Sequence, residues 1–565
     1  MKRKVGILSA VLVFILGLAV WCPAQTKTLT ILHTNDTHSA LLPFTHQPCP
    51  TPLTWFLMDS RLSWPDELRG PCGFNRDYAG IARMATLIHR IRGAKKNVLA
   101  LNAGDVFVGS FEFNQYLGYP ELKIMEGLYD AMALGNHEFD LGLGVLAGVV
   151  TGAFAQSDPV ELPLLCANFA FVNPADPNDP TNVLAGIVKE SIIRTIDGVK
   201  IGIFGLGNED PVNYSAEVAA RFSGHPLEVA AAQVASLRGS GCQVIICVSH
   251  QGTSFDVDEL SAVDGIDIIV GGHSHELFRK AVVRNGTIIV QAGSHGRYLG
   301  ELQVKVGAGG VKLLSWRIHE VDAAVKPDPA IQAQLRPLRE GVVARFGPVY
   351  SETVATAFRT IGHDWPAAGP YRDTPLGNLV TDAMTAAAKK AGFAADCALD
   401  ALGYTEFGIP AGKVVGNDIL RAVPYGYDPA TGLGFKLVVV PMPGLLIIGG
   451  LDYAVSQKSS ALSIQASGLT YAYHSGAGHV IPESILINGQ PLVADNLYDV
   501  VMSEGVFSFL EALAKAQGFP LTAIPTEISE YTAVRDFMKS LGFVNYKSEG
   551  RVIDAAAAEP AVKRK

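Results

Sequence analysis

Between residue 28 and about residue 320, short apolar runs alternate with longer amphipathic stretches, and this alternation constrains the fold most. Runs rich in Val, Ile and Leu predict buried strands, and the stretches between them predict helices, such as Gly80–Arg92 and Pro226–Arg238. The predicted strands are Leu29–His33, Val98–Leu101, Ala131–Leu134, Lys200–Phe204, Val244–Val248, Ile266–Val270 and Thr287–Val290. Strands and helices in alternation indicate a layered α/β domain.

Clusters rich in Asp and His follow five of these predicted strands. Their sequences are HTNDTH, NAGD, GNHEFD, SHQG and GGHSH. Ligands in α/β sheets gather at the carboxyl ends of strands, so we expect the clusters to converge on one crevice. Glycines within them allow sharp turns and a close approach of the backbone to a ligand.

The clusters hold seven side chains that can ligate metals: four imidazoles, two carboxylates and one amide. They are Asp36, His38, Asp105, Asn136, His250, His273 and His275. A single Zn²⁺ needs only three or four protein ligands, so this set suits two cations that share a carboxylate and a water or hydroxide. The mixed nitrogen and oxygen donors suit Zn²⁺, Mn²⁺, Fe²⁺ or Co²⁺, and suit Ca²⁺ poorly.

Several of these residues, taken singly, have ordinary structural explanations. A lone His after a strand is more often a hydrogen-bonded residue than a ligand, and Asp140 alone is typical of a helix N-cap. We interpret His33 as a strand residue and leave His295, in QAGSHG, unassigned. Cys242 and Cys247 lie in an apolar run and are interpreted as buried small hydrophobes. The prediction of a metal site therefore depends on the five clusters together.

The blocks DTH, GD, GNHEFD, SHQG and GGHSH resemble those of the calcineurin-like metallophosphoesterases. The flanking TLTILHTNDTHS, YAGIARMATLI and QAGSHGRYLG resemble the 5′-nucleotidase family, which includes UDP-sugar hydrolases and 2′,3′-cyclic-nucleotide phosphodiesterases. The resemblance covers nearly all of residues 28–320. It implies an α/β fold: a four-layer metallophosphoesterase β-sandwich with flanking helices, followed by a second α/β (α+β) domain for substrate specificity.

The resemblance also implies roles for single residues. It implies a first metal held by Asp36, His38, Asp105 and His275. It implies a second metal held by Asp105, Asn136, His250 and His273, with Asp105 bridging the two. His137 and Asp140 match the family's catalytic dyad, in which His137 stabilises developing charge or protonates the leaving oxygen. Glu138 is interpreted as supporting structure.

A second set of elements follows a predicted connecting helix, Asp328–Arg345. It includes the helix Leu376–Ala388 and the strands Lys436–Val440 and Tyr498–Met502. YRDTPLGNLVTDAM, residues 371–384, resembles the family's C-terminal domain, more weakly and over roughly residues 350–550.

Two residues of this second domain are predicted to bind substrate, because Arg372 matches a family arginine and Tyr425 can replace a stacking Phe. The domain also departs from the family. A neighbouring arginine appears as Pro370, and the segment Asp400–Thr405 lacks the Asn and the Arg of a Gly-rich family loop. A GGDG-type loop has no convincing equivalent near Phe507–Ala516. Loss of this amide donor and this guanidinium predicts weak, broad activity on 5′-mononucleotides, and an ionised Asp400 would also repel a nearby phosphate. Ordinary divergence within a nucleotidase is the alternative.

The N-terminus reads as a targeting segment, with basic Met1–Lys4, apolar Val5–Val20 and a cleavage site before Gln25. A short membrane anchor is the alternative. The predicted organisation is a signal peptide (1–24), a phosphoesterase domain (25–325, with an inserted loop at 41–78), a linker helix (326–349), a 5′-nucleotidase C-terminal-like domain (350–553) and a disordered tail (554–565). The mature protein is predicted to be periplasmic or secreted, where Cys49 and Cys72 are a plausible disulfide.

Together these features predict an exported two-metal phosphoesterase, a metal-dependent phosphoric ester hydrolase. Its substrates would be phosphate esters of nucleotides or related small molecules, attacked in line by a water between the metals. The net charge of −9 argues against nucleic acid and anionic membranes as partners, and the oligomeric state stays open. The alternatives are a non-nucleotide phosphoester substrate, or a non-catalytic ligand-binding descendant, which should have lost metal ligands first.

Overall fold

The computed structural model describes residues 26–46, 76–173, 175–176, 178–210, 214–362, 372–459, 461–516 and 518–558. The predicted signal peptide, most of the predicted insertion and the pair Cys49 and Cys72 lie outside the described residues. Within the described ranges, no helix has both the length and the apolar character needed to cross a membrane. Cys242 and Cys247 are buried and free, as predicted.

Two six-stranded sheets form the N-terminal domain. The first has the order β14 (Gly310–Glu320), β13 (Tyr298–Gly307), β1 (Lys27–Thr34), β4 (Val98–Asn102), β5 (Ala131–Ala133) and β6 (Leu164–Leu165). The second has the order β11 (Val282–Arg284), β12 (Thr287–Val290), β10 (Ile268–Gly271), β9 (Val244–Ser249), β8 (Val199–Leu206) and β7 (Ser191–Ile196). In each sheet the four strands β1–β4–β5–β6 or β12–β10–β9–β8 run parallel.

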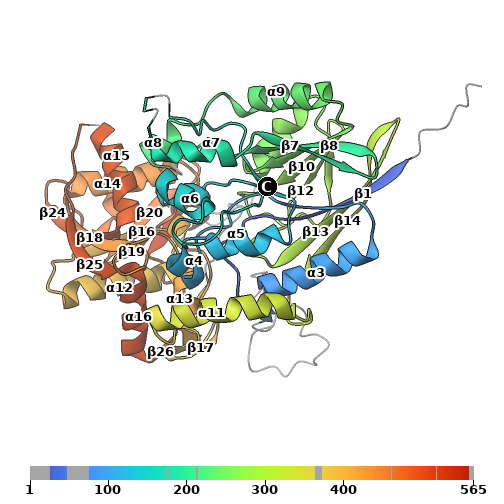
Figure 1. The fold of residues 1–565 in the computed structure, drawn as a ribbon. Coiled ribbons are helices and arrows are strands. Elements are labelled where there is room, and N and C mark those ends of the chain that lie inside the picture. The colour runs from blue at the N-terminus through green and yellow to red at the C-terminus, as the bar shows by residue number, and fades with distance from the viewer. Residues whose placement is uncertain are drawn as a thin grey trace, which may run out of the picture.

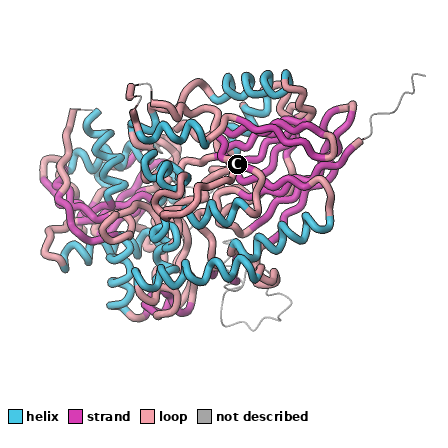
Figure 2. Tube along the Cα trace, viewed as in Figure 1, coloured by secondary structure: helices cyan, strands magenta, loops and turns pink. Residues whose placement is uncertain are grey.

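The two sheets pack face to face through a core that includes Ile31, Leu101, Ile203 and Ile246. Helices cover both outer faces, which gives the predicted four layers (Figures 1 and 2). Those on the first sheet are α3 (Ile81–Ala94), α4 (Phe111–Tyr116), α5 (Tyr119–Glu126) and α6 (Gly142–Val150), and those on the second are α9 (Pro226–Gly239) and α10 (Thr253–Asp258). Every residue of β9 is buried because both of its faces are covered, which explains its unbroken apolar sequence.

All seven predicted strands are present, and their ends differ from the prediction by at most two residues. At the two ends of the predicted inserted loop, β2 (Phe44–His46) and β3 (Arg76–Tyr78) pair antiparallel. Short helices α7 (Leu184–Ile187) and α8 (Ala216–Ala219) complete this half of the chain.

The connecting helix α11 (Pro329–Phe346) begins at Asp328, whose side chain accepts hydrogen bonds from the backbone N–H groups of Ala330 and Ile331. It contacts α3 and α4 and runs along the lower edge of both halves of the molecule in Figure 1. Phe111 of α4 packs against Phe346 at its end and against Tyr531 of the C-terminal domain. The two halves therefore share apolar contacts.

The C-terminal domain is built on a five-stranded sheet with two smaller sheets beside it. The main sheet has the order β19 (Ile464–Ser467), β16 (Cys397–Ala401), β24 (Leu497–Ser503), β18 (Lys436–Pro443) and β25 (Ile524–Ser529). A three-stranded sheet contains β17 (Gly412–Val415), β15 (Thr353–Ala357) and β26 (Phe543–Val544). The third contains β20 (Leu469–His474), β21 (His479–Val480), β22 (Leu486–Ile487), β23 (Gln490–Pro491) and β27 (Val552–Asp554).

Helices cover both faces of the main sheet. One face carries α12 (Pro375–Lys390) and α16 (Glu530–Leu541), with α13 (Gly416–Ala422) in the same core, and the other carries α14 (Gly444–Ser456) and α15 (Glu504–Ala516). The predicted disordered tail starts too early, because Asp554 ends β27, which pairs with β20, and α17 (Ala555–Ala558) follows it.

Candidate metal centre and active site

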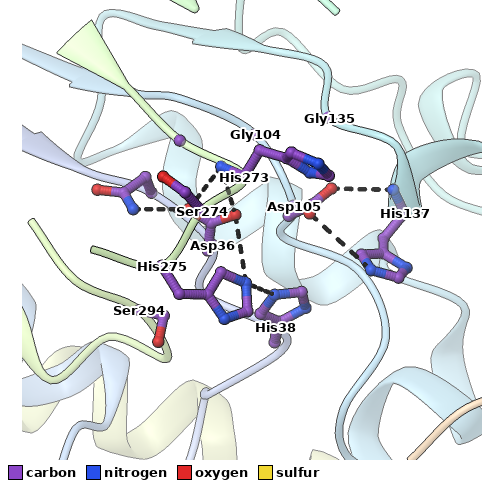
Figure 3. A network of polar contacts seen from close by, with 12 residues as sticks. Asp36, His38, Gly104, Asp105, Gly135, His137, His273, Ser274, His275 and Ser294 are labelled. Atoms are coloured by element: carbon purple, nitrogen blue, oxygen red, sulfur yellow. Dashed lines mark hydrogen bonds and ion pairs between the residues drawn. The ribbon is translucent and has the colours of Figure 1, made fainter. Parts of the chain in front are cut away.

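Five parallel strand ends from the two sheets meet at one edge of the sandwich and carry the candidate ligands. Asp36 and His38 follow β1, Asp105 follows β4, and Asn136 follows β5 in the first sheet. His250 follows β9, and His273 and His275 follow β10, in the second. Loops from both sheets therefore face each other across the end of the sandwich, as Figure 3 shows.

The first donor cluster consists of Asp36, His38 and His275, whose ligating atoms all lie within 4.8 Å of one another. His38 Nε2 lies 3.0 Å from His275 Nε2, which lies 3.5 Å from Asp36 Oδ1 (Figure 3). The Asp36 carboxylate is held by Asn35 Nδ2 at 2.6 Å and by the His273 backbone N–H at 2.9 Å. These contacts fix the carboxylate before any ligand binds.

The second cluster consists of Asp105, His250 and His273, again within 4.8 Å. His250 Nε2 lies 2.9 Å from Asp105 Oδ2, and Asn136 Oδ1 lies 3.0 Å from His273 Nδ1. His250 Nε2 is also 3.8 Å from Asp36 Oδ1, so the two clusters adjoin. The structure thus brings together all seven predicted ligands.

Glu138 holds the loops of the second cluster in place. Its two carboxylate oxygens accept hydrogen bonds from the backbone N–H groups of Asp105, Val106, Phe107 and Gly135, at 2.6–3.2 Å. The loop after β4 and the loop after β5 are therefore clamped by one buried carboxylate. Its contacts agree with the interpretation of Glu138 as supporting structure.

The backbone of the ligand loops is unusual. Asp36, His38, Asp105, His273 and His275 all have φ between 44° and 70°, a region that residues other than Gly seldom adopt, although Asn, Asp and His are enriched there. Gly104, at φ 91°, lies so close to Gly135 that a Cβ on Gly104 would overlap the Gly135 backbone, and a Cβ on Gly135 would overlap Asp105. Close packing of these loops sets the positions of the ligands.

His137 and Asp140 form the predicted pair beside the second cluster. A single 3₁₀ turn, His137–Phe139, brings Asp140 Oδ2 to 2.7 Å from His137 Nδ1. The His137 backbone N–H donates to Asp105 Oδ1 at 2.9 Å. The His137 side-chain Nε2 lies 4.0 Å from Asp105 Oδ2. Burial lowers the pKa of His137, but Asp140 and Asp105 outweigh burial and raise it to about 10.

The donors fit two divalent cations. His250 Nδ1 faces the Ala103 carbonyl oxygen at 2.6 Å, so its buried Nε2 points at the cluster, where it lies 2.9 Å from Asp105 Oδ2. This arrangement is typical of metal-binding His residues, whose second ring nitrogen is held by a carbonyl or carboxylate. Burial lowers the pKa of His38 and His273 to about 3, which keeps both imidazoles in the neutral form that binds metals.

Sequence reasoning missed Glu406 and left His295 unassigned. His295 follows β12, and its Nε2 lies 3.3 Å from Glu406 Oε1; His275 Nδ1 lies 3.5 Å from the same oxygen. Glu406 belongs to the C-terminal domain, so a carboxylate from that domain reaches the first cluster. No sequence motif marked it. His33, by contrast, is a buried residue stacked on Trp316, as interpreted.

A cleft of about 3100 Å³ lies between the domains and opens onto His137, Asp140 and both clusters. The exposed Arg359 and Arg372 line it, as do the aromatic rings of Tyr404, Phe435 and Phe507. Tyr425 also lines it, but one face of its ring stacks on His137, with the centroids 5.6 Å apart.

Asp400 does not face this cleft, which corrects the expectation that it repels phosphate. It lies in β16, where Leu399 and Ala401 line the cleft and the alternation of the strand turns Asp400 to the opposite face. Asp400 is buried there, and its electrostatic coupling is to Glu530 of α16. Thr405 does line the cleft, with its hydroxyl donating to the Leu402 carbonyl.

Comparison with known proteins matches both halves of the chain to families. Residues 29–277 match the calcineurin-like phosphoesterases, and residues 355–510 match the 5′-nucleotidase C-terminal domain. The chain is 27% identical to the trifunctional nucleotide phosphoesterase protein YfkN of Bacillus subtilis (strain 168), over 93% of this chain and 35% of that protein. It is 30% identical to the 5′-nucleotidase of Diplobatis ommata, over 67% of this chain and 62% of that protein.

A solved structure extends the match to the whole fold. The crystal structure of a 5′-nucleotidase precursor from Thermus thermophilus superposes with a TM-score of 0.75 at 28% identity, over 94% of this chain and 99% of that chain. The chain spans about a third of YfkN and less than two thirds of the Diplobatis 5′-nucleotidase.

The fold and the donor clusters together resemble those of the calcineurin-like phosphoesterases. More narrowly, the two halves of the chain are similar to those of proteins that join a calcineurin-like phosphoesterase domain to a 5′-nucleotidase C-terminal domain. The cofactors of this family are two divalent metal ions.

Proposed function

We propose that the protein is an exported two-metal phosphoesterase that hydrolyses phosphate esters of nucleotides or related small molecules. One observation carries the proposal: two adjoining donor clusters and the His137–Asp140 pair open onto the same cleft. Export rests on the basic and apolar segment at residues 1–24.

In this proposal Asp36, His38, Asp105 and His275 would hold one cation. Asp105, Asn136, His250 and His273 would hold the other, with Asp105 shared. When bound, the two cations neutralise phosphoryl oxygens and activate water as the nucleophile. Asn35 and Glu138 keep the ligand loops in position, so little of the site has to rearrange when the ligands are engaged.

His137 is placed to act as the proton donor. Asp140 Oδ2 accepts from His137 Nδ1, which leaves the Nε2–H of the imidazolium free to be donated to the leaving oxygen of the ester. Because His137 lines the cleft with its side chain 17% exposed, a substrate can reach it. Asp140 orients the ring and stabilises the imidazolium until its proton is transferred.

The cleft supplies groups for the rest of the substrate. The guanidinium groups of Arg359 and Arg372 suit an anionic group, and Arg372 remains a predicted substrate contact. The rings of Tyr404, Phe435 and Phe507 offer surfaces on which a nucleobase can stack, a contact worth about 1–3 kcal/mol per base in single-stranded nucleic acid complexes.

A second candidate substrate is a phosphoester without a nucleobase. The departure of the segment Asp400–Thr405 from the family favours this candidate, because the Asn and the Arg of the family loop are missing there. The complete set of ligands argues against a non-catalytic descendant, since nothing would retain all seven once hydrolysis was lost.

A substrate panel tests the proposal. Purified protein loaded with Mn²⁺, Zn²⁺ or Co²⁺ is assayed for phosphate release from adenosine monophosphate, 2′,3′-cyclic adenosine monophosphate, UDP-glucose and p-nitrophenyl phosphate. We expect metal-dependent hydrolysis, weak and broad on 5′-mononucleotides. An Asp105→Asn preparation purified in parallel controls for contaminating phosphatases.

Two outcomes count against the proposal in different ways. No hydrolysis with any metal on any substrate removes the enzyme assignment. A kcat/KM near ~10⁶ M⁻¹s⁻¹ for adenosine monophosphate, well inside the range of efficient enzymes, identifies an ordinary nucleotidase and removes the expectation of weak nucleotide activity.

A further inference from the structure

Glu406 is the point at which the C-terminal domain reaches the first donor cluster. It follows the 3₁₀ turn Leu402–Tyr404, and its side chain is 18% exposed. Oε1 lies 3.5 Å from His275 Nδ1 and 3.3 Å from His295 Nε2, two residues that follow different strands of the N-terminal domain. The contact therefore joins the two domains at a predicted metal ligand.

The second oxygen of Glu406 is also engaged. Tyr425 donates its hydroxyl to Glu406 Oε2 at 2.9 Å, and the Tyr425 ring stacks on His137 at an interplanar angle of 27°. Glu406 and Tyr425, a hydrogen-bonded pair from the C-terminal domain, thus contact His275 at the first cluster and His137 of the predicted dyad.

The next residue, Phe407, anchors Glu406 on the N-terminal domain. Its ring lies 4.2 Å from that of His295 and 5.1 Å from that of Phe44, measured between centroids. The Arg421 guanidinium stacks on both phenyl rings, 3.6 Å from the centroid of Phe44 and 4.9 Å from that of Phe407. The position of Glu406 is therefore set by packing, and not by the flexibility of its own side chain.

The two nitrogens of His275 face different partners. Nε2 faces Asp36 and His38, whereas Nδ1 faces Glu406. A His that binds a metal through one nitrogen commonly donates its other N–H to a carboxylate, which fixes the ring and strengthens the ligand.

We propose that Glu406 is a positioning residue that orients His275 for the first cation and so couples metal binding to docking of the C-terminal domain. The inference rests on the proposed metal site. Removing such an outer partner typically weakens metal affinity 10–100-fold. Because coupling is reciprocal, metal binding must in turn favour the docked arrangement of the domains.

Co²⁺ titration of the full chain tests the first half of the proposal. Binding is followed by calorimetry and by the visible absorption of the bound ion, which reports its ligand geometry, for the wild type, Glu406→Gln and Glu527→Gln. Glu527 lies in the same domain with its side chain 85% exposed and serves as the matched control. We expect one of two sites to weaken 10–100-fold in Glu406→Gln with a changed spectrum, and both sites to be unchanged in Glu527→Gln.

Hydrogen exchange of the wild type tests the second half without any substitution. Peptides that contain Leu402–Phe407 should exchange more slowly once Co²⁺ is bound, because docking is favoured. Unchanged exchange, or wild-type affinity and spectrum in a folded Glu406→Gln protein, overturns the proposal. A wild type that binds three Co²⁺, falling to two in Glu406→Gln, also overturns it, since Glu406 would then be a ligand itself. Normal Co²⁺ binding without hydrolysis removes only the proposed function.

Discussion

The two sides of the cleft are built in different ways. On the N-terminal side, every candidate ligand lies directly after a parallel strand, as Asp36 does after β1 and His250 after β9. On the C-terminal side, Glu406 and Tyr425 lie in connecting segments, and their partners His275 and His137 belong to the other domain. The ligands on the N-terminal side are positioned by the sheets of their own domain, whereas Glu406 and Tyr425 are positioned by contacts with the other domain.

The N-terminal side therefore carries the groups proposed for the reaction, and the C-terminal side carries those proposed to select the substrate. The strand ends hold donors in place through local contacts, such as the four backbone N–H groups bonded to Glu138. The opposite wall offers the guanidinium groups of Arg359 and Arg372 and the aromatic rings of Tyr404, Phe435 and Phe507. We therefore expect substitutions on the N-terminal side to change metal content and kcat. Substitutions on the C-terminal side, apart from those at Glu406, should change KM or leave catalysis unaffected.

Asp105→Asn is the strongest test of the N-terminal side. A neutral amide cannot neutralise two cations, so bound metal should fall and hydrolysis should drop to background together. Elemental analysis and phosphate release measure the two effects. Asp258→Asn, on an exposed side chain outside the site, should change neither. A fully active Asp105→Asn protein with two metals per chain would remove the shared-carboxylate assignment.

His137→Ala separates proton transfer from metal binding. We expect kcat to fall roughly 10²–10⁴-fold, the usual range for loss of a positioned acid–base group, with metal content nearly unchanged. Asp140→Asn should also lower kcat, by a smaller factor, because the His137 ring is then less well oriented but keeps its proton-donating nitrogen. Steady-state kinetics with elemental analysis measure both, and wild-type turnover in His137→Ala would show that the dyad is misassigned.

Arg372→Ala tests the C-terminal side. Loss of an exposed guanidinium that meets an anionic group should raise KM by about tenfold, equivalent to ~1.4 kcal/mol, with kcat nearly unchanged. Arg336→Ala, on the exposed face of α11, is the matched control. If kcat falls and KM does not, Arg372 acts on the transition state and the separation between the two sides breaks down.

Asp400→Asn should have the smallest effect on activity and a specific effect on stability. Burial raises the pKa of Asp400 to about 7, so the neutral carboxyl is the favoured form in the fold. The stabilising contribution of this neutral carboxyl is fully present below the pKa of Asp in the unfolded chain, ~3.9. It is lost as the pH rises through the folded-state pKa of about 7. The wild type should therefore lose stability over this range relative to Asp400→Asn, by up to ~1.4 kcal/mol per pH unit.

Denaturant unfolding at pH 5 and pH 8 measures this difference. Asp536→Asn, at an exposed position, should keep the wild-type pH dependence. The kcat/KM of Asp400→Asn should match the wild type, because Asp400 does not line the cleft. Parallel pH profiles for Asp400→Asn and the wild type would show that the carboxyl is ionised in the fold.

The sequence predicted the N-terminal half well because its signals are local. The strand Thr287–Val290 was predicted to the residue, and each ligand was placed by its position after an apolar run. In the C-terminal domain, strands far apart in the sequence pair with each other, as β16 does with β24, and no short motif reports such pairing. Only three of its elements were therefore predicted.

Two residues show where sequence reasoning stopped. Asp400 was predicted to lie beside the substrate because β16 was not recognised as a strand. In a strand, Asp400 faces away from its neighbours Leu399 and Ala401, and this alternation would have predicted the opposite face for it. Glu406 could not be found at all, because its function depends on how the two domains dock. His295 had the same position after a strand as the assigned ligands, but the donor set was already complete without it.

The contact between Gly104 and Gly135 limits how this protein can vary. Neither residue has a side chain for chemistry, yet a methyl group on either would overlap backbone atoms or Asp105 in the neighbouring loop. A change elsewhere cannot easily relieve a clash with backbone, since the strands that carry both loops are fixed by the sheet. In a saturation-mutagenesis selection for function, both glycines should tolerate as few replacements as the metal ligands. We therefore expect a change of specificity to arise from substitutions in the C-terminal wall of the cleft, which can change without moving the loops.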